Sequence, residues 1–155
     1  MSNTTSPRLV ALDLDGTLLN HQGQVTPHTR QAIAEAVARG IVVLPATGRP
    51  LSNLPPVVAQ LTGIRYAITS NGAAVWDLGT DPISAVYSRY CNAAEHRTTE
   101  PVSLIARPMP VELAREAFAL YMEYPGAMSV FCDGRTYRDT VAMERFARRN
   151  ARRVK

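Results

Sequence analysis

The chain has 155 residues, of which 46% are hydrophobic and 19% are charged, and its formal net charge is +4. This composition is typical of a globular domain and excludes a disordered chain. No apolar run approaches the roughly 18 residues that a membrane span needs, and the opening MSNTTSPR has neither the basic nor the apolar part of a secretion signal. Cys91 and Cys132 form no CxxC or disulfide-rich pattern, which fits a reducing compartment. We therefore expect a cytoplasmic protein without a membrane partner.

The positive charge is concentrated near the end of the chain. Seven Lys or Arg residues lie between Arg138 and Lys155, against two acidic residues, Asp139 and Glu144. Such a segment could contact a nucleic acid, but Phe146 is its only aromatic residue and it contains no nucleic-acid-binding motif. We predict a solvated, arginine-rich helix here and no nucleic-acid partner.

The first part of the chain alternates strands and helices. Residues 8–13 and 41–47 are apolar runs typical of strands that are buried on both faces of a parallel sheet. Between them, Thr26 suits the N-cap of a helix, Pro27 its first position, and Gly40 the position just beyond its end.

A second helix and a hairpin follow. Residues 50–63 predict a helix that ends at Gly63, and residues 66–70 predict a third strand. The dipeptide Asn71–Gly72 then predicts a turn into a returning strand over 73–77. This alternation of strands and helices predicts an α/β fold with a parallel sheet and right-handed crossovers.

The pattern changes after Asp81. Residues 83–90 alternate like a strand, residues 110–124 have the period of an amphipathic helix, and residues 127–139 predict a hairpin with its turn at Asp133–Gly134. We therefore predict two units, residues 1–82 and an α+β unit of residues 83–155.

Polar clusters follow three of the predicted strands: DLDGT at 13–17, ATGR at 46–49 and TSNG at 69–72. Ligands in open α/β sheets bind beyond the carboxyl ends of the strands, so we expect these clusters to meet at one edge. Asp13 and Asp15 would point to the same side, with Leu14 turned into the core. Two adjacent carboxylates repel unless one is protonated or a cation such as Mg²⁺ lies between them. The alternative is an aspartate pair that only caps a turn.

The segment DLDGTLLN resembles the first motif, DxDGT, of the haloacid dehalogenase (HAD) superfamily of phosphatases. ATGR resembles the second motif, and TSNGA at 69–73 is similar to a segment of the Cof-type branch, subfamily IIB. The resemblance covers residues 8–138. It implies part of a Rossmann-like, three-layer core with a parallel sheet, followed by part of an inserted α+β cap.

The resemblance also implies roles for individual residues. Asp13 would attack the substrate phosphorus, form an aspartyl-phosphate and bind Mg²⁺. Asp15 would exchange protons with the leaving alcohol and the attacking water, and its backbone carbonyl would contact the metal. Thr47 and Gly48 would bind phosphate oxygens.

Two further residues have alternative interpretations. Arg49 and Asn71 are expected in the same site. The alternative for Arg49 is an ion pair with a surface acid, and the alternative for Asn71–Gly72 is a plain turn.

Two later motifs of the family are missing. Lys155 is the only lysine, and no GDxxND segment occurs, although Asp133 and Asp139 lie late in the chain. We therefore expect the N-terminal portion of a Mg²⁺-dependent phosphatase of small phosphorylated metabolites, such as sugar phosphates, with weak or no activity. We also expect marginal stability, because the first strand would lie at a sheet edge. The alternatives are a non-catalytic module that binds phosphate esters and, less well supported, a phosphomutase-like enzyme.

Overall fold

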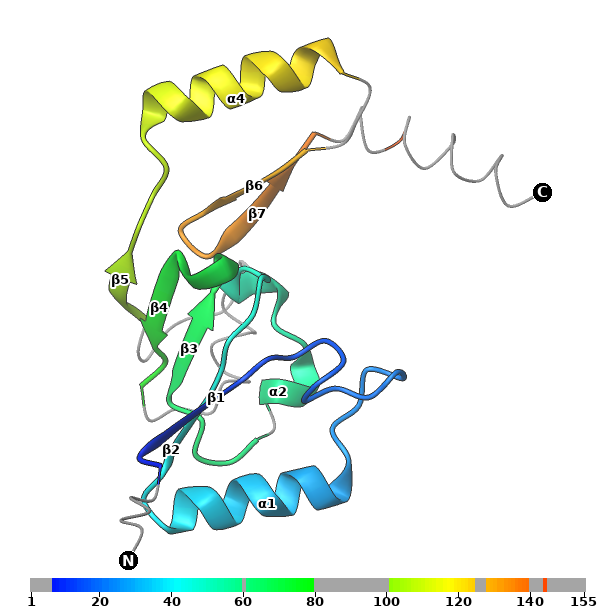
Figure 1. Cartoon of the computed structure of the whole chain (residues 1–155), viewed down its shortest axis with the longest axis vertical. Helices are drawn as coiled ribbons and strands as arrows, with labels where there is room; N and C mark the ends of the chain where they lie inside the picture. Colours follow the sequence, from blue (N-terminus) through cyan, green and yellow to red (C-terminus); the bar gives the residue numbers. More distant parts are fainter. Residues whose placement is uncertain (1–6, 60, 80–100, 125–127, 140–143, 145–155) are drawn as a thin grey trace, which may run out of the picture.

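The computed structural model describes residues 7–59, 61–79, 101–124, 128–139 and 144 (Figure 1). The predicted strand over 83–90, Cys91, and most of the predicted arginine-rich helix lie outside these residues. The described strands are β1 Leu9–Leu12, β2 Val42–Pro45, β3 Tyr66–Thr69, β4 Ala74–Asp77, β5 Val102–Ala106, β6 Ser129–Cys132 and β7 Arg135–Arg138. The helices are α1 Pro27–Ala38, α2 Pro56–Ala59 and α4 Val111–Glu123, with two short 3-10 segments, η1 Leu51–Asn53 and η2 Ser70–Gly72.

The strands form a mixed arrangement, with parallel pairing on one side and antiparallel pairing on the other. β1 pairs with β2 in parallel, and a parallel bridge between Ala46 and Ile68 joins β2 to β3. β3, β4 and β5 then pair antiparallel, so the sheet extends past the predicted boundary between the two units. Figure 1 shows α1 beyond β1 and β2 at one end of the molecule, and α4 at the other end, past the β6–β7 hairpin. The predicted α/β fold with parallel strands is confirmed.

The predicted burial of the first strand on both faces is wrong. Residues in β1 alternate between exposed and half-buried, and Leu9 is 53% exposed. Within the described residues β2 is the only strand paired with β1, so β1 lies at a sheet edge and one side of it remains open. β2, which has neighbours on both sides, is buried from Val43 to Pro45.

Helix α1 forms for the reasons that its sequence indicates. The Thr26 hydroxyl accepts a hydrogen bond from the Thr29 N–H (3.2 Å), which caps the first turn, and Pro27 is the first helical residue. Gly40, with φ of +77°, follows the last turn in the left-handed conformation that glycine tolerates best. Ile33 is buried and fixes the helix face that packs on the core.

The single helix predicted over residues 50–63 is wrong. The segment divides into η1 and α2, and Leu54 between them is extended, with φ of −63° and ψ of 132°. Pro55 is the cause, because a residue that precedes proline is driven out of the helical region. Leu51 and Leu54 are each only 2% exposed, so the broken segment still packs firmly on the core.

Both predicted hairpins are present. β3 and β4 are joined by a loop of residues 70–73, in which Ser70 and Asn71 both have positive φ. Asp133 (φ +48°) and Gly134 (φ +73°) turn β6 into β7, as in the left-handed two-residue turns that suit hairpins. β5 was not predicted, because its short run, VSLIA, lies close to prolines on both sides.

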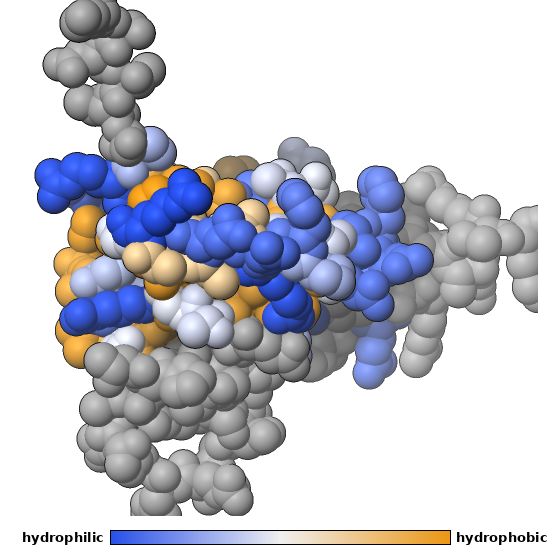
Figure 2. All heavy atoms as spheres, turned by 90° about the horizontal axis from the view of Figure 1, so that it is seen from below, coloured by the Kyte–Doolittle hydropathy of each residue, from blue (hydrophilic) through white to orange (hydrophobic). Residues whose placement is uncertain are grey.

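The described apolar core lies around β2, β3 and the loops next to them. Its buried members include Leu14, Val43, Val58, Ala67, Trp76 and Leu78. The predicted helix over 110–124 is confirmed as α4, but large apolar side chains on it, including Phe118 and Leu120, are exposed. Seen from below, the surface also has apolar patches among hydrophilic side chains (Figure 2). No helix among the described residues is long and apolar enough to cross a membrane.

Leu14→Ala tests the core, because Leu14 is fully buried between two exposed aspartates. We expect the substitution to lower the free energy of unfolding by about 2–5 kcal/mol, from lost transfer energy and the cavity left behind. Urea unfolding followed by circular dichroism measures the loss. Leu113→Ala, on the exposed surface of α4, is the matched control and should cost less than about 0.5 kcal/mol. Equal losses in the two variants would contradict the described core.

Candidate active site

The ends of three strands lie at one edge of the sheet. The Ala46 N–H donates to the Leu12 carbonyl (2.8 Å), and the Thr47 N–H donates to the Ile68 carbonyl (3.0 Å). These two bonds fix the register of β1, β2 and β3 where each strand ends. The three polar clusters that follow the strands therefore come together at this edge, as predicted.

The loop after β1 presents two carboxylates outward. Asp13 and Asp15 are exposed, whereas Leu14 between them is fully buried, as predicted. The Leu18 N–H donates to the Asp13 carbonyl (3.0 Å), and the Thr17 hydroxyl donates a longer bond to the Asp13 carboxylate (3.4 Å). Gly16 has φ of +82°, a conformation that few other residues adopt, so the glycine of DxDGT is required for this tight loop.

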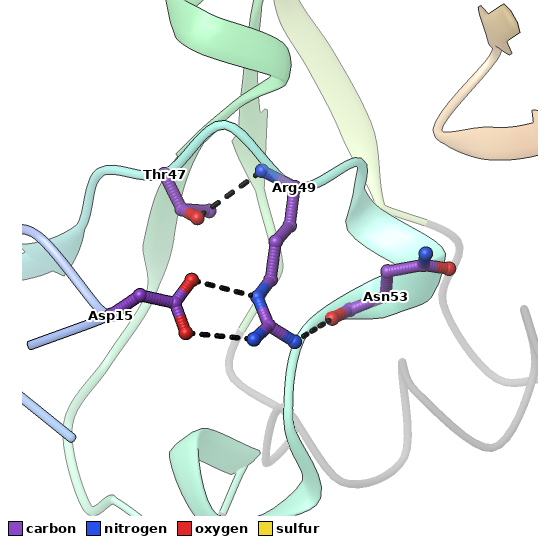
Figure 3. Close-up of polar contacts among 4 residues, drawn as sticks. All are labelled: Asp15, Thr47, Arg49 and Asn53. Atoms are coloured by element: carbon purple, nitrogen blue, oxygen red, sulfur yellow. Dashed lines mark hydrogen bonds and ion pairs between the residues drawn. The ribbon is translucent and has the colours of Figure 1, made fainter. Parts of the chain in front are cut away.

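Arg49 forms a two-point ion pair with Asp15 (Figure 3). Its Nε donates to Asp15 Oδ2 (3.0 Å) and its Nη2 donates to Asp15 Oδ1 (2.7 Å). The hydrogen bonds from Arg49 hold the pKa of the Asp15 carboxyl below its ordinary value, and the same bonds raise the pKa of the guanidinium. The alternative interpretation of Arg49, pairing with an acid, is therefore the observed one, and the acid belongs to the predicted site.

Thr47, Gly48 and Asn71 form the other side of the site. The buried Thr47 hydroxyl accepts from the Arg49 N–H (3.2 Å), and the Asn71 N–H donates to the Thr47 carbonyl (3.2 Å). A Cβ added at Gly48 would lie 2.7 Å from Asn71 Oδ1, so a larger residue here would require the Asn71 side chain to move. Asn71, with φ of +57°, is thus both a turn residue and a neighbour of the second cluster.

The chemistry of these groups suits a phosphate ester. The Thr47 hydroxyl accepts a bond from Arg49 but still has its own proton to donate to an anion. Arg49 supplies a cation, and Asp13 supplies an exposed carboxylate that can act as a nucleophile. Phosphoryl transfer depends mainly on such positioning and charge neutralisation.

Asp13 is the residue of this site whose side chain could bind Mg²⁺. Among the residues that the structure describes, no group of three or more His, Cys, Asp or Glu side chains could hold a metal ion. The Asp15 carboxylate is bonded to Arg49, which leaves Asp13 as the carboxylate of the DLDGT loop that is open to a cation. One or two carboxylates with phosphate and water oxygens are an ordinary set of Mg²⁺ ligands.

Two neighbouring contacts have no signal in the sequence. The third arm of Arg49, Nη1, donates to the Asn53 carbonyl in η1 (3.4 Å). The Ser52 N–H in the same segment donates to the Gly134 carbonyl in the β6–β7 turn (2.8 Å). Both acceptors are backbone carbonyls, which every residue type has, so no residue pattern could have identified them.

Comparison with known proteins identifies the family. Residues 10–94, more than half of the chain, match the haloacid dehalogenase-like hydrolase family. The chain therefore belongs to this family. The comparisons also support the Cof-type branch that its motifs resemble.

Two curated relatives are bacterial phosphatases. The HMP-PP phosphatase of Serratia proteamaculans is 32% identical over 126 residues, which cover 81% of this chain and 38% of that protein. The 5-amino-6-(5-phospho-D-ribitylamino)uracil phosphatase YcsE of Bacillus subtilis is 39% identical over 70 residues, which cover 45% of this chain and 28% of the relative. The chain thus spans about a third of the length of these relatives.

Solved structures share the fold. A haloacid dehalogenase-like hydrolase from B. subtilis superposes with a TM-score of 0.60 at 26% identity, covering 80% of this chain and 36% of that chain. A sugar phosphatase of HAD subclass IIB has the same TM-score of 0.60 at 21% identity, covering 90% of this chain and 47% of that chain. The second similarity, at this low identity, concerns the fold alone.

Arg49→Ala should raise the pKa of Asp15 toward its ordinary value of 3.8. Because the folded-state pKa is lowered, the pair stabilises the fold above the unfolded-state pKa, and this contribution is lost as the pH falls through the folded-state value. Titration of the aspartate carboxyl carbons by NMR measures the shift.

Asp77 provides the internal control for that titration. Arg65 lowers its pKa through a similar two-point pair at a different place in the fold. The pKa of Asp77 should be unchanged in Arg49→Ala and should rise in Arg65→Ala. An unchanged Asp15 pKa in Arg49→Ala would contradict the ion pair.

Proposed function

We propose that this site belongs to a Mg²⁺-dependent phosphatase that hydrolyses small phosphorylated metabolites, of the sugar-phosphate kind, through an aspartyl-phosphate. The observation that carries the proposal is the convergence of Asp13, Thr47 and Arg49 at the carboxyl ends of three paired strands. The names of the two relatives, both phosphatases, support the same reaction class.

The reaction divides into two displacements. A carboxylate oxygen of Asp13 attacks phosphorus, a bond forms between that oxygen and phosphorus, and the bond from phosphorus to the ester oxygen breaks. Asp15 gives its proton to the departing alkoxide. Water then attacks phosphorus, Asp15 takes the proton from that water, and the bond to Asp13 breaks to release phosphate.

Other residues of the site bind the substrate. The Thr47 hydroxyl and the Gly48 N–H donate to phosphate oxygens, and Asn71 and Arg49 line the same site. Asp13 would hold Mg²⁺, together with the backbone carbonyl of Asp15, and the ion would neutralise charge on the phosphoryl group. The Asp15 side chain, also expected as a metal ligand, is bonded to Arg49.

The proposal includes the predicted organisation of the chain. Residues 1–82 would form part of a HAD hydrolase core, and residues 83–155 part of an α+β cap over it, in a cytoplasmic protein. Because the sequence contains one lysine, Lys155, and no GDxxND segment, we expect the chain to turn over phosphate esters slowly or not at all.

Asp13→Asn tests the nucleophile without requiring turnover. Beryllofluoride mimics a phosphoryl group on a carboxylate, so the chain with Mg²⁺ should give a bound ¹⁹F NMR signal that Asp13→Asn lacks. Hydrolysis of p-nitrophenyl phosphate with Mg²⁺ is measured alongside, and any rate above background should also disappear in Asp13→Asn. A bound signal that persists in Asp13→Asn would refute the assignment. Asp133→Asn, which removes a carboxylate from the β6–β7 turn, serves as the matched control.

A second function is favoured by one observation. Both oxygens of Asp15 accept bonds from Arg49, which opposes the protonation that catalysis needs, so the site is suited to binding phosphate esters without turnover.

Thr47→Val tests this binding module. Removing a hydroxyl that donates to an anion should weaken binding of a phosphate ester about tenfold or more. Calorimetric titration with glucose 6-phosphate measures the affinity, and Thr29→Val, in the first turn of α1 and outside the candidate site, is the control. Saturable binding without hydrolysis that Thr47→Val weakens would favour the binding module. Saturable binding that is equal in both variants would place the phosphate site elsewhere.

A further inference from the structure

Arg49 holds the carboxylate of Asp15 through two hydrogen bonds. Arg49 Nε and Nη2 occupy both carboxylate oxygens of Asp15, at 3.0 and 2.7 Å. Charge-assisted two-point bonds of this kind are strong and fix the orientation of the carboxylate. The orientation of the Asp15 carboxylate therefore depends on Arg49 and on the groups that restrain Arg49.

Arg49 is restrained by η1 as well as by Asp15. Its Nη1 donates to the Asn53 carbonyl at 3.4 Å, the longest of the side-chain bonds of Arg49 (Figure 3). Because hydrogen bonds weaken quickly beyond about 3.2 Å, a small displacement of the Asn53 carbonyl would break this contact first. The conformation of η1 therefore determines whether Arg49 keeps its third contact.

The β6–β7 turn is bonded to the same segment. The Gly134 carbonyl accepts from the Ser52 N–H at 2.8 Å, and Ser52 immediately precedes Asn53. The Ser52 hydroxyl also lies 3.1 Å from Asn53 Oδ1, and the Asn53 N–H donates to the Pro50 carbonyl (2.9 Å). These contacts hold Ser52 and Asn53 in a fixed relative position, so a displacement of Ser52 also displaces Asn53.

We propose that the β6–β7 turn positions Arg49 on Asp15 through η1. The Gly134 carbonyl holds the Ser52 N–H, and this bond keeps the Asn53 carbonyl within reach of the guanidinium. When the turn shifts away from η1, Arg49 loses its third contact and its hold on Asp15 weakens. Ser52 and Gly134 are positioning residues, and their effect on catalysis rests on the proposed function, since it assumes that Asp15 transfers a proton.

The bond between Arg49 and Asp15 can be followed directly by hydrogen exchange of the Arg49 Nε–H in the full ¹⁵N-labelled chain, assigned with Arg49→Lys. Ser52→Pro removes the donor to Gly134, whereas Ser52→Ala keeps it. Gly134→Ala disturbs the turn from the other side, because Gly134 has φ of +73°. We expect exchange of the Arg49 Nε–H to become about three- to tenfold faster in Ser52→Pro and Gly134→Ala, the range that loss of one hydrogen bond produces. Ser52→Ala keeps the N–H donor and loses only the hydroxyl contact with Asn53 Oδ1, so it should accelerate exchange less than Ser52→Pro.

Arg65 is the internal reference, since its Nε–H donates to Asp77 (3.0 Å) in a comparable two-point pair. Its exchange should stay constant in all variants. Unchanged Arg49 exchange in both Ser52→Pro and Gly134→Ala would overturn the proposal, and so would equal acceleration at Arg49 and Arg65, which indicates general destabilisation. If Ser52→Pro does not fold, Gly134→Ala decides alone. The measurement needs no substrate, so its outcome is independent of the beryllofluoride and hydrolysis tests of Asp13.

Discussion

The parallel pairing of β1, β2 and β3 is the constraint on which the site depends. Two backbone bonds, from Ala46 to Leu12 and from Thr47 to Ile68, bring the strand ends to one edge. Parallel strands leave their carboxyl ends on the same side, so the loops that follow must share that space. A shift of one residue in either pairing would reverse the side chains on that strand and separate the polar clusters.

At the same edge of the sheet, packing of the core orients polar side chains of the candidate site. Leu14 is fully buried, and Asp13 and Asp15 on either side of it are exposed, so the burial of one apolar side chain orients two carboxylates. On the other side of the site, the Asn71 side chain lies so close to Gly48 that a side chain there would displace it. Both arrangements place a packing contact next to residues of the candidate site.

The ion pair with Arg49 stabilises the ionised form of the Asp15 carboxylate. A two-point bond to a guanidinium favours the ionised carboxylate and makes it a weaker base. The reaction that we propose for this site would therefore require Arg49 to release the Asp15 carboxylate when a proton is transferred. In our proposal, the contact of Arg49 with η1, and of η1 with the β6–β7 turn, controls how firmly Arg49 is held on Asp15.

Much of the local structure could be predicted from the sequence. Thr26, Pro27 and Gly40 mark the ends of α1, and Asp133–Gly134 marks the turn of the last hairpin, because capping and turn conformations depend on the residue itself and its nearest neighbours. The break at Leu54 was also local, but the periodic apolar pattern on both sides concealed the effect of Pro55. The family could also be identified from the sequence, because its motifs are short and continuous.

The sequence by itself thus determined the fold class, the family and the residues that come to the site. Tertiary structure alone decided that Arg49 pairs with Asp15, that β1 is half-exposed, and that the β6–β7 turn contacts η1. Asp15 and Arg49 are 34 residues apart, and any of several acids could have been the partner until the strands set the distances. The Ser52–Gly134 bond joins two backbone groups, which are the same in every residue. Only the folded chain can select such a pair, because the selection depends on position in space and not on side-chain chemistry.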